Sequence, residues 1–281
     1  MILLAALLLA EARPPAWSTT PWARAPIASA DFESHPAFDR AGGRLYFVRS
    51  SPEFRGWKIL EATCHAGRWS EPKPPSFAGV GVEADPFLTD DGKTLFFISS
   101  RKEDGVEGRG LDLWRVDRPR PSAPWGKPQR LPEPLNSAGN EWFPRLASDG
   151  WLYFGSDRPG GHGQTDIYRG RQVGGRWQVE NLGAEVNSAS DEYEADISRD
   201  GRRMILMADG DLFLVKSSHG RWHERVKLSP EINSAQMEVG ALFSPNGTSF
   251  LFARDLGRGR GSGEFLLARK GKNENWPPRC G

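Results

Sequence analysis

The chain of 281 residues is predicted to be all-β, a single β-propeller, from three observations. Tight-turn signals recur five times, each preceded by a short alternating strand and followed by a run of β-branched, aromatic and other apolar residues. A third strand follows each hairpin, and a fourth that opens on tryptophan comes after it. Four-stranded antiparallel units repeated at roughly 45 to 56 residues are typical of propeller blades.

The turns fix the register of the repeat, because Asp-Gly and Asn-Gly favour two-residue hairpin loops with positive φ. They are Ala41-Gly42-Gly43, Asp91-Gly92, Asp149-Gly150, Asp200-Gly201 and Asn246-Gly247, and the fourth strands open on Trp69, Trp125, Trp177, Trp222 and Trp276. We therefore predict five blades, with six as the alternative. Their approximate bounds are 31–79, 80–137, 138–188, 189–234 and 235–281.

The N-terminus has two predicted parts. Residues 1–12 resemble a signal peptide, because a short apolar run is followed by Ala10-Glu11-Ala12. A mis-annotated start or a membrane tether is the alternative. Residues 13–281 form the propeller, in which the segment 20–29, with Trp22, reads like a fourth strand that completes the last blade and closes the ring. We expect a periplasmic or secreted protein with no later membrane span.

Composition excludes some partners. The net charge of +1 gives no broad attraction to nucleic acid, so no nucleic-acid partner is expected, and we expect a monomer.

The two cysteines, Cys64 and Cys280, could form one disulfide in an oxidising compartment. Two unpaired thiols are the alternative.

Acidic residues recur at one position of the repeat. A glutamate lies nine residues before each turn glycine: Glu33, Glu83, Glu141, Glu192 and Glu238. Side chains alternate along a strand, so the second and fourth residues after each glutamate should share its face, which adds Asp85, Glu194 and Asp196. Five-fold closure then predicts an acidic ring around one mouth of the central channel.

The acidic ring has two interpretations. In the structural one, each glutamate accepts backbone N–H bonds from the neighbouring blade. In the functional one, the ring binds a basic peptide or a cation, with calcium as the candidate and Glu192, Glu194, Asp196 and Asp85 as its densest ligand set. No other cofactor is expected. The third-strand aspartates Asp112, Asp166 and Asp211 are expected to hold the bend through Arg101, Arg158 or backbone groups.

The repeats resemble a known family. ASDGWLYFGSDRPGGHGQTDIY (147–168) and TDDGKTLFFISSR (89–101) are similar to the WD40-like repeat called PD40, found in the TolB periplasmic propeller and its relatives. The resemblance covers about residues 31–270. It implies the propeller fold and leaves the function open, because such repeats serve many tasks.

The functional expectation is a non-catalytic, exported, TolB-like propeller that binds a protein or peptide or acts as a scaffold. No nucleophile elbow or zinc spacing occurs, and no catalytic residue is assigned. TolB-like proteins and peptidases with similar propellers carry a further domain, for which this chain has no room. The alternative is a glycoside hydrolase that uses two axial carboxylates from Glu33, Asp85, Glu141, Glu194 and Asp196.

Overall fold

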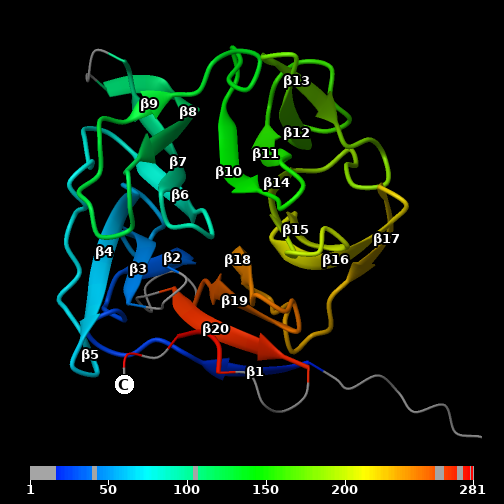
Figure 1. The fold of residues 1–281 in the computed structure, drawn as a ribbon. Helices are drawn as coiled ribbons and strands as arrows, with labels where there is room; N and C mark the ends of the chain where they lie inside the picture. Colours follow the sequence, from blue (N-terminus) through cyan, green and yellow to red (C-terminus); the bar gives the residue numbers. More distant parts are fainter. Residues whose placement is uncertain are drawn as a thin grey trace, which may run out of the picture.

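The computed structural model describes residues 17–39, 43–103, 107–256, 263–270, 275–278 and 280, without the side chains of 107–109. The predicted signal peptide lies outside the described residues. Strands and turns make up the described chain, in five four-stranded antiparallel sheets arranged around one axis (Figure 1). The prediction of a five-bladed propeller is confirmed. Among the residues described, no helix is long and apolar enough to cross a membrane.

Each blade runs from an inner strand near the axis to an outer strand at the rim (Figure 1). Blade 1 consists of β2 (Phe32–Phe38), β3 (Arg44–Ser50), β4 (Lys58–His65) and β5 (Arg68–Trp69). Blade 2 consists of β6 (Glu83–Leu88), β7 (Thr94–Arg101), β8 (Glu107–Asp117) and β9 (Gln129–Arg130). Blade 3 consists of β10 (Glu141–Leu146), β11 (Leu152–Ser156), β12 (Asp166–Val173) and β13 (Arg176–Asn181).

Blade 4 consists of β14 (Glu192–Ile197), β15 (Arg203–Ala208), β16 (Asp211–Ser218) and β17 (Arg221–Lys227). Blade 5 combines β18 (Glu238–Phe243), β19 (Ser249–Arg254) and β20 (Glu264–Arg269) with β1 (Ser18–Pro21). The strand order β1-β20-β19-β18 brings the N-terminal strand to the outer edge of the last blade. The ring is therefore closed by the N-terminal strand, as predicted.

The closing strand lies earlier in the chain than predicted. Strand pairing with β20 covers Ser18–Pro21, whereas the tryptophan signal predicted residues 20–29. Trp22 still donates its backbone N–H to the carbonyl of Phe265 (2.8 Å), but the chain then turns at residues 25–28. Pro26, which has no N–H to donate to a ladder, explains why the strand does not continue.

A disulfide holds the two ends of the ring together. Cys64 on β4 is bonded to Cys280 in the C-terminal tail, across a sequence separation of 216 residues. The bridge attaches the end of the chain to the first blade. Both described cysteines are thereby accounted for.

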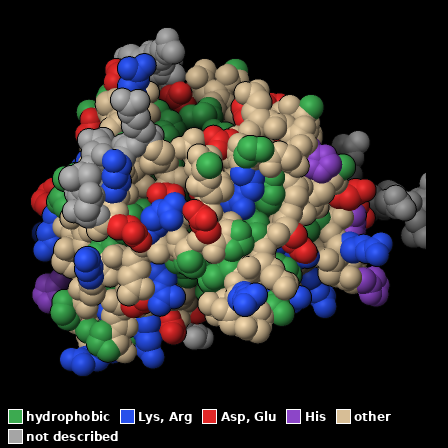
Figure 2. Space-filling model, turned by 90° about the horizontal axis from the view of Figure 1, so that it is seen from above, with side chains coloured by type: hydrophobic (Ala, Val, Ile, Leu, Met, Phe, Trp, Pro, Cys, Tyr) green, Lys and Arg blue, Asp and Glu red, His purple; other side chains and the backbone are tan. Residues whose placement is uncertain are grey.

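Apolar side chains fill the spaces between neighbouring blades. One core cluster joins Tyr46 of blade 1 to Trp114 of blade 2, another joins Ile98 of blade 2 to Phe154 of blade 3, and similar clusters continue around the ring. Lys and Arg side chains are interspersed with Asp and Glu on the side of the disk that Figure 2 shows. The blades thus pack through apolar faces, and the inner strands are free to direct polar side chains to the axis.

The inner strands carry an irregularity that the alternation rule does not anticipate. Four of them have positive φ at the second residue after the repeated glutamate: His35 (52°), Asp85 (55°), Phe143 (50°) and Gly240 (66°). Register shifts mark the same place in every inner strand, including the one between Glu192 and Glu194. A bulge re-aims the side chains that follow it. The glutamates and the residues after them therefore have different surroundings.

Candidate functional site

The five repeated glutamates are buried in what we call Glu–Arg clamps. Each carboxylate is at most 1% exposed and is paired with one arginine. The pairs are Glu33–Arg49, Glu83–Arg101, Glu141–Arg158, Glu192–Arg225 and Glu238–Arg254. Four of the glutamates also accept hydrogen bonds from the N–H and hydroxyl of the serine four residues earlier, and Glu83 accepts one from the N–H of Gly79.

The clamps join each inner strand to the segment that leads into it. Arg158 donates to Glu141 Oε1 (3.1 Å) and to the carbonyl of Leu135 (2.7 Å). Arg254 repeats the arrangement with Glu238 Oε1 (2.8 Å) and the carbonyl of Ile232 (2.6 Å). Burial raises the pKa of Glu141, opposed by Ser137 and Arg158. Each of the five glutamates of the predicted ring is therefore paired with an arginine of its own blade and accepts hydrogen bonds from the linker that precedes it.

The expectation for Arg101 and Arg158 is corrected in the same way. Both arginines belong to clamps, so the third-strand aspartates use other partners. Asp112 pairs with Arg130 (2.7 Å) and Asp211 with Lys227 (2.6 Å). Asp166 accepts the backbone N–H groups of His162 and Gly163, which is the backbone alternative of the prediction.

A second, asymmetric cluster lies across the axis and is formed by residues that follow the glutamates. We call it the axial cluster: His35, Asp85, Arg145, Glu194 and Asp196, all at most 4% exposed. His35 Nε2 lies 3.2 Å from Asp85 Oδ1 and 3.0 Å from Glu194 Oε1. These three side chains come from blades 1, 2 and 4, so only ring closure brings them together.

Backbone donors from the next blade fix each carboxylate of the axial cluster. Phe143 N–H donates to Asp85 Oδ2 (2.9 Å), and Phe243 N–H donates to Asp196 Oδ2 (2.7 Å). Gly240 N–H donates to Glu194 Oε2 (2.6 Å). These three acids therefore have backbone N–H donors on the inner strand of the neighbouring blade, whereas the repeated glutamates accept backbone N–H groups from the linkers between blades.

Arg145 is the second cationic group of the axial cluster. Its Nε donates to Asp196 Oδ1 (3.1 Å), and Nη1 donates to the carbonyl of Pro144 (2.9 Å). The guanidinium lies over the rings of Phe143 (3.4 Å) and Phe87 (5.5 Å). Nη2 is buried and has no hydrogen-bond partner among the described residues. Packing against the two rings, as well as charge, holds this arginine in place.

Burial and the unequal numbers of acids and bases shift proton affinities in the axial cluster. Burial raises the pKa of Asp85, and it raises the pKa of Asp196 to about 6 despite the opposing charge of Arg145. Burial alone would lower the pKa of His35, but the charges of Asp85 and Glu194 outweigh it and raise that pKa. Burial lowers the pKa of Arg145. Three carboxyl groups face two cationic groups, so the cluster favours holding an additional proton.

The structure divides the predicted site residues between the two arrangements. Asp85, Glu194 and Asp196 lie in the axial cluster, whereas Glu33, Glu83, Glu141, Glu192 and Glu238 lie in clamps. His35 and Arg145 were not among the predicted site residues. Repeat alignment places them at the second and fourth positions after a glutamate, which is the signal that could have identified them.

The four acids of the candidate calcium set do not converge. Glu192 is paired with Arg225, Asp196 with Arg145, and Asp85 and Glu194 with His35. In the described part of the chain, no group of three or more His, Cys, Asp or Glu side chains is arranged to hold a metal ion. Protein cations occupy the positions beside these carboxylates.

Comparison with known proteins gives fold neighbours only. No protein-family model matches the chain. No curated protein matches it either. Among solved structures, a TolB homologue (described as putative) from Agrobacterium tumefaciens superimposes with a TM-score of 0.53 at 14% identity, covering 87% of this chain and 79% of its own.

Two similar structures are enzymes. The catalytic domain of a GH62 α-L-arabinofuranosidase from Coprinopsis cinerea has a TM-score of 0.52 at 13% identity, covering 92% of this chain and 97% of its own. A gluconolactonase from Xanthomonas campestris has a TM-score of 0.50 at 13% identity, covering 92% and 95%. At such low identity these likenesses establish a shared fold.

The enzyme neighbours nevertheless contradict the expectation of a non-catalytic binding or scaffolding module. That expectation relied on the lack of a further domain beside the propeller. In the arabinofuranosidase, a propeller matched over nearly its whole length is itself the catalytic domain. The absence of a second domain is therefore no argument against catalysis, and the expectation is wrong on this ground.

Proposed function

We propose that this chain is a propeller hydrolase that cleaves glycosidic bonds with the carboxyl groups of Asp85 and Glu194. The observation that carries the proposal is the pair of buried acids from blades 2 and 4 that both contact His35, at 3.2 and 3.0 Å from the same Nε2 atom. Glycoside hydrolysis requires two carboxyl groups with different protonation, placed on either side of the scissile bond. The five clamps cannot supply them, since each of their glutamates is paired with an arginine.

The spacing favours a retaining mechanism. Two oxygens that both contact one nitrogen at these distances can be at most about 6 Å apart. Retaining enzymes hold their carboxyl groups about 5–5.5 Å apart, and inverting enzymes separate them by about 6.5–9.5 Å to admit a water molecule. The pair in the axial cluster falls below the inverting range.

The surroundings suggest a role for each acid. Burial raises the pKa of Asp85, which suits a general acid that protonates the leaving oxygen. Glu194, held by Gly240 N–H, would attack the anomeric carbon and form the glycosyl intermediate. His35 and the Arg145–Asp196 pair would position the two acids and supply positive charge beside them. The Asp85 and Glu194 side chains keep 6% and 5% exposure, through which substrate would reach them.

The cellular setting belongs to the same proposal. The Cys64–Cys280 disulfide supports export to an oxidising compartment, the periplasm or the exterior. The Asp-Gly repeat signals support membership of the PD40 group within the TolB-like propellers. A protein or peptide partner is not required for the proposed activity.

The test is turnover of aryl glycosides, beginning with α-L-arabinofuranosides because a fold neighbour cleaves them. Glu194→Gln and Asp85→Asn should each lower kcat by at least about 10³-fold, within the range expected on removing a nucleophile or a general acid. The product should keep the anomeric configuration of the substrate, as followed by proton NMR.

Glu141→Gln is the matched control, because it changes an equally buried glutamate of an inner strand to the same residue. Its kcat per folded molecule should stay within about twofold of the wild type, since Glu141 contacts its own clamp only. A folded wild-type protein with no turnover across a broad glycoside panel would refute the proposal. Full activity of Glu194→Gln would refute the assignment of the nucleophile.

A further inference from the structure

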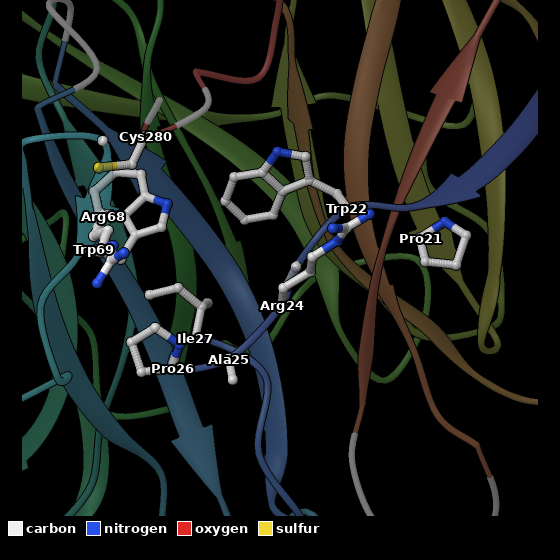
Figure 3. Close-up of a pocket in the computed structure, with 11 residues that line it drawn as sticks. Pro21, Trp22, Arg24, Ala25, Pro26, Ile27, Arg68, Trp69 and Cys280 are labelled. Atoms are coloured by element: carbon white, nitrogen blue, oxygen red, sulfur yellow. The ribbon is translucent and has the colours of Figure 1, made fainter.

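A pocket of about 540 Å³ lies at the seam where the ring closes, between the chain that follows β1 and the outer edge of blade 1. Its walls include Trp22, Arg24, Ile27, Arg68, Trp69 and Cys280. Figure 3 shows Trp22 and Arg24 on one side of the hollow and Arg68, Trp69 and Cys280 on the other. We call it the seam pocket. Its volume is in the range of small-ligand sites.

Neighbouring structure holds the walls of the seam pocket in place. The Trp22 ring packs edge-on against Phe38 (5.3 Å) and Phe265 (6.0 Å), so it is anchored in the core of the seam. Trp69 lies on β5, and Cys280 is tied to β4 by its disulfide with Cys64. The two indoles are therefore held by neighbouring structure, and both are only partly buried.

The charged side chains described in the lining of the seam pocket are both cationic. Arg24 and Arg68 are exposed, and neither guanidinium has a hydrogen bond or an ion pair with any residue that the structure describes. Among the residues that the structure describes, no aspartate or glutamate lines the pocket. By contrast, the clamp arginines and Arg145 are each paired with a carboxylate. An arginine fork with no partner matches a carboxylate in both charge and shape.

We propose that the seam pocket binds a uronic-acid-containing oligosaccharide, with sugar rings against Trp22 and Trp69 and a sugar carboxylate on Arg24 and Arg68. That the ligand is a sugar rests on the proposed glycosidase function. That the ligand is acidic rests on the two unpaired arginines of the seam pocket. Rigid aromatic walls with a few convergent polar groups are the usual composition of a small-ligand site. The seam pocket would hold one part of an acidic glycan at the rim of the propeller, while the axial cluster cleaves a bond in another part of the same glycan.

Calorimetric titration with trigalacturonic acid and with its fully methyl-esterified form tests the proposal. The acid should bind at least tenfold more tightly than the ester, because esterification removes the charge and keeps the rings. Arg24→Gln with Arg68→Gln should abolish that preference, and Trp69→Ala should weaken both ligands. Raising the salt concentration should weaken only the acid.

Arg176→Gln with Arg221→Gln is the matched control, because it removes two exposed arginines from β13 and β17. That variant should bind like the wild type. Equal affinity for acid and ester, or unchanged binding after loss of Arg24 and Arg68, would overturn the proposal.

Titrations in the Glu194→Gln background separate the two proposals. Binding that persists there, in a protein without turnover, supports the seam pocket independently of catalysis. Turnover of small aryl glycosides with no binding of trigalacturonic acid would refute the seam pocket and leave the glycosidase proposal standing.

Discussion

The Glu–Arg clamps and the axial cluster use residues of the same inner strands, two or four positions apart, yet they differ in symmetry. The clamps repeat in all five blades with the same chemistry, a buried glutamate, an arginine and in four blades a serine. The axial positions hold a different residue in every blade: His35, Asp85, Phe143, Glu194 and Gly240. We infer that the clamp repeats because every blade needs this ion pair for its stability. The axial positions differ between blades because together they form a single cluster.

The comparison also separates two uses of a buried acid. In a clamp, the charge of the glutamate is balanced locally by an arginine and by hydroxyl or backbone donors. In the axial cluster, three acids from two blades share one histidine and one arginine from two others. Local balance gives a structural ion pair, whereas the shared, incomplete balance leaves a proton to be exchanged.

Breaking one clamp is expected to give the largest change in stability. Glu141→Ala should lower the free energy of unfolding by about 3–5 kcal/mol, because Arg158, Ser137 and Ser156 lose their shared acceptor. Urea denaturation followed by tryptophan fluorescence measures it. Glu180→Ala, which breaks the exposed pair with Arg169, should cost at most about 1 kcal/mol. Equal losses in both variants would contradict a structural role for the clamps.

The pH dependence of stability should come from the axial cluster. Burial raises the pKa of Asp196 to about 6, from the ordinary aspartate value of 3.8. The folded state therefore binds this proton more tightly, and the resulting stability is present below about pH 4 and is lost as pH rises through 6. The loss should be roughly 3 kcal/mol.

Urea denaturation of the wild type and of Asp196→Asn between pH 4 and pH 7 measures this effect. The asparagine variant should lack the part of the pH dependence that Asp196 supplies, so the difference between the two curves should change over this range. Parallel curves would show that Asp196 does not titrate in the folded protein as we infer.

The smallest expected effect tests the close approach of blades at the axis. Gly240 has φ of 66°, and a Cβ there would lie 2.6 Å from the backbone nitrogen of His35. Gly240→Ala should lower the free energy of unfolding by about 1–3 kcal/mol. It should also lower the kcat of the proposed glycosidase activity, because the N–H donor to Glu194 moves.

Gly174→Ala is the control, since Gly174 also has positive φ (59°) but has nothing within 4 Å of the added Cβ. It should cost about 1 kcal/mol and leave the kcat of the proposed activity unchanged. A similar result for the two alanine variants would mean that backbone conformation, and not contact with His35, limits residue 240.

Part of the site could be read from the sequence. Nine-residue spacing from each turn identifies Glu141 and its four equivalents, and Asp85, Glu194 and Asp196 follow from counting two or four residues onward. Alternation alone then places all of them on one face. The bulge in each inner strand breaks this alternation. The bulge depends on positive φ at residues such as His35 and Asp85, and the sequence gives no signal for that conformation.

Other parts depended on partners distant in the chain. Arg225 serves the clamp of Glu192 from the outermost strand of its blade, where no repeat position would place it. His35 reaches Glu194 across 159 residues. The closing strand begins at Ser18 because of its pairing with β20 and the turn near Pro26, and not where the tryptophan signal suggested.

The sequence by itself determined the repeat, the all-β class, the five blades and the recurrence of the glutamates, because turn chemistry and strand periodicity act over a few neighbouring residues. Tertiary structure alone decided which acids share a proton, where the ring closes, and that Cys64 meets Cys280. These outcomes require residues from different blades to meet. Only closure of the ring, driven by the apolar faces packed between blades, sets those distances.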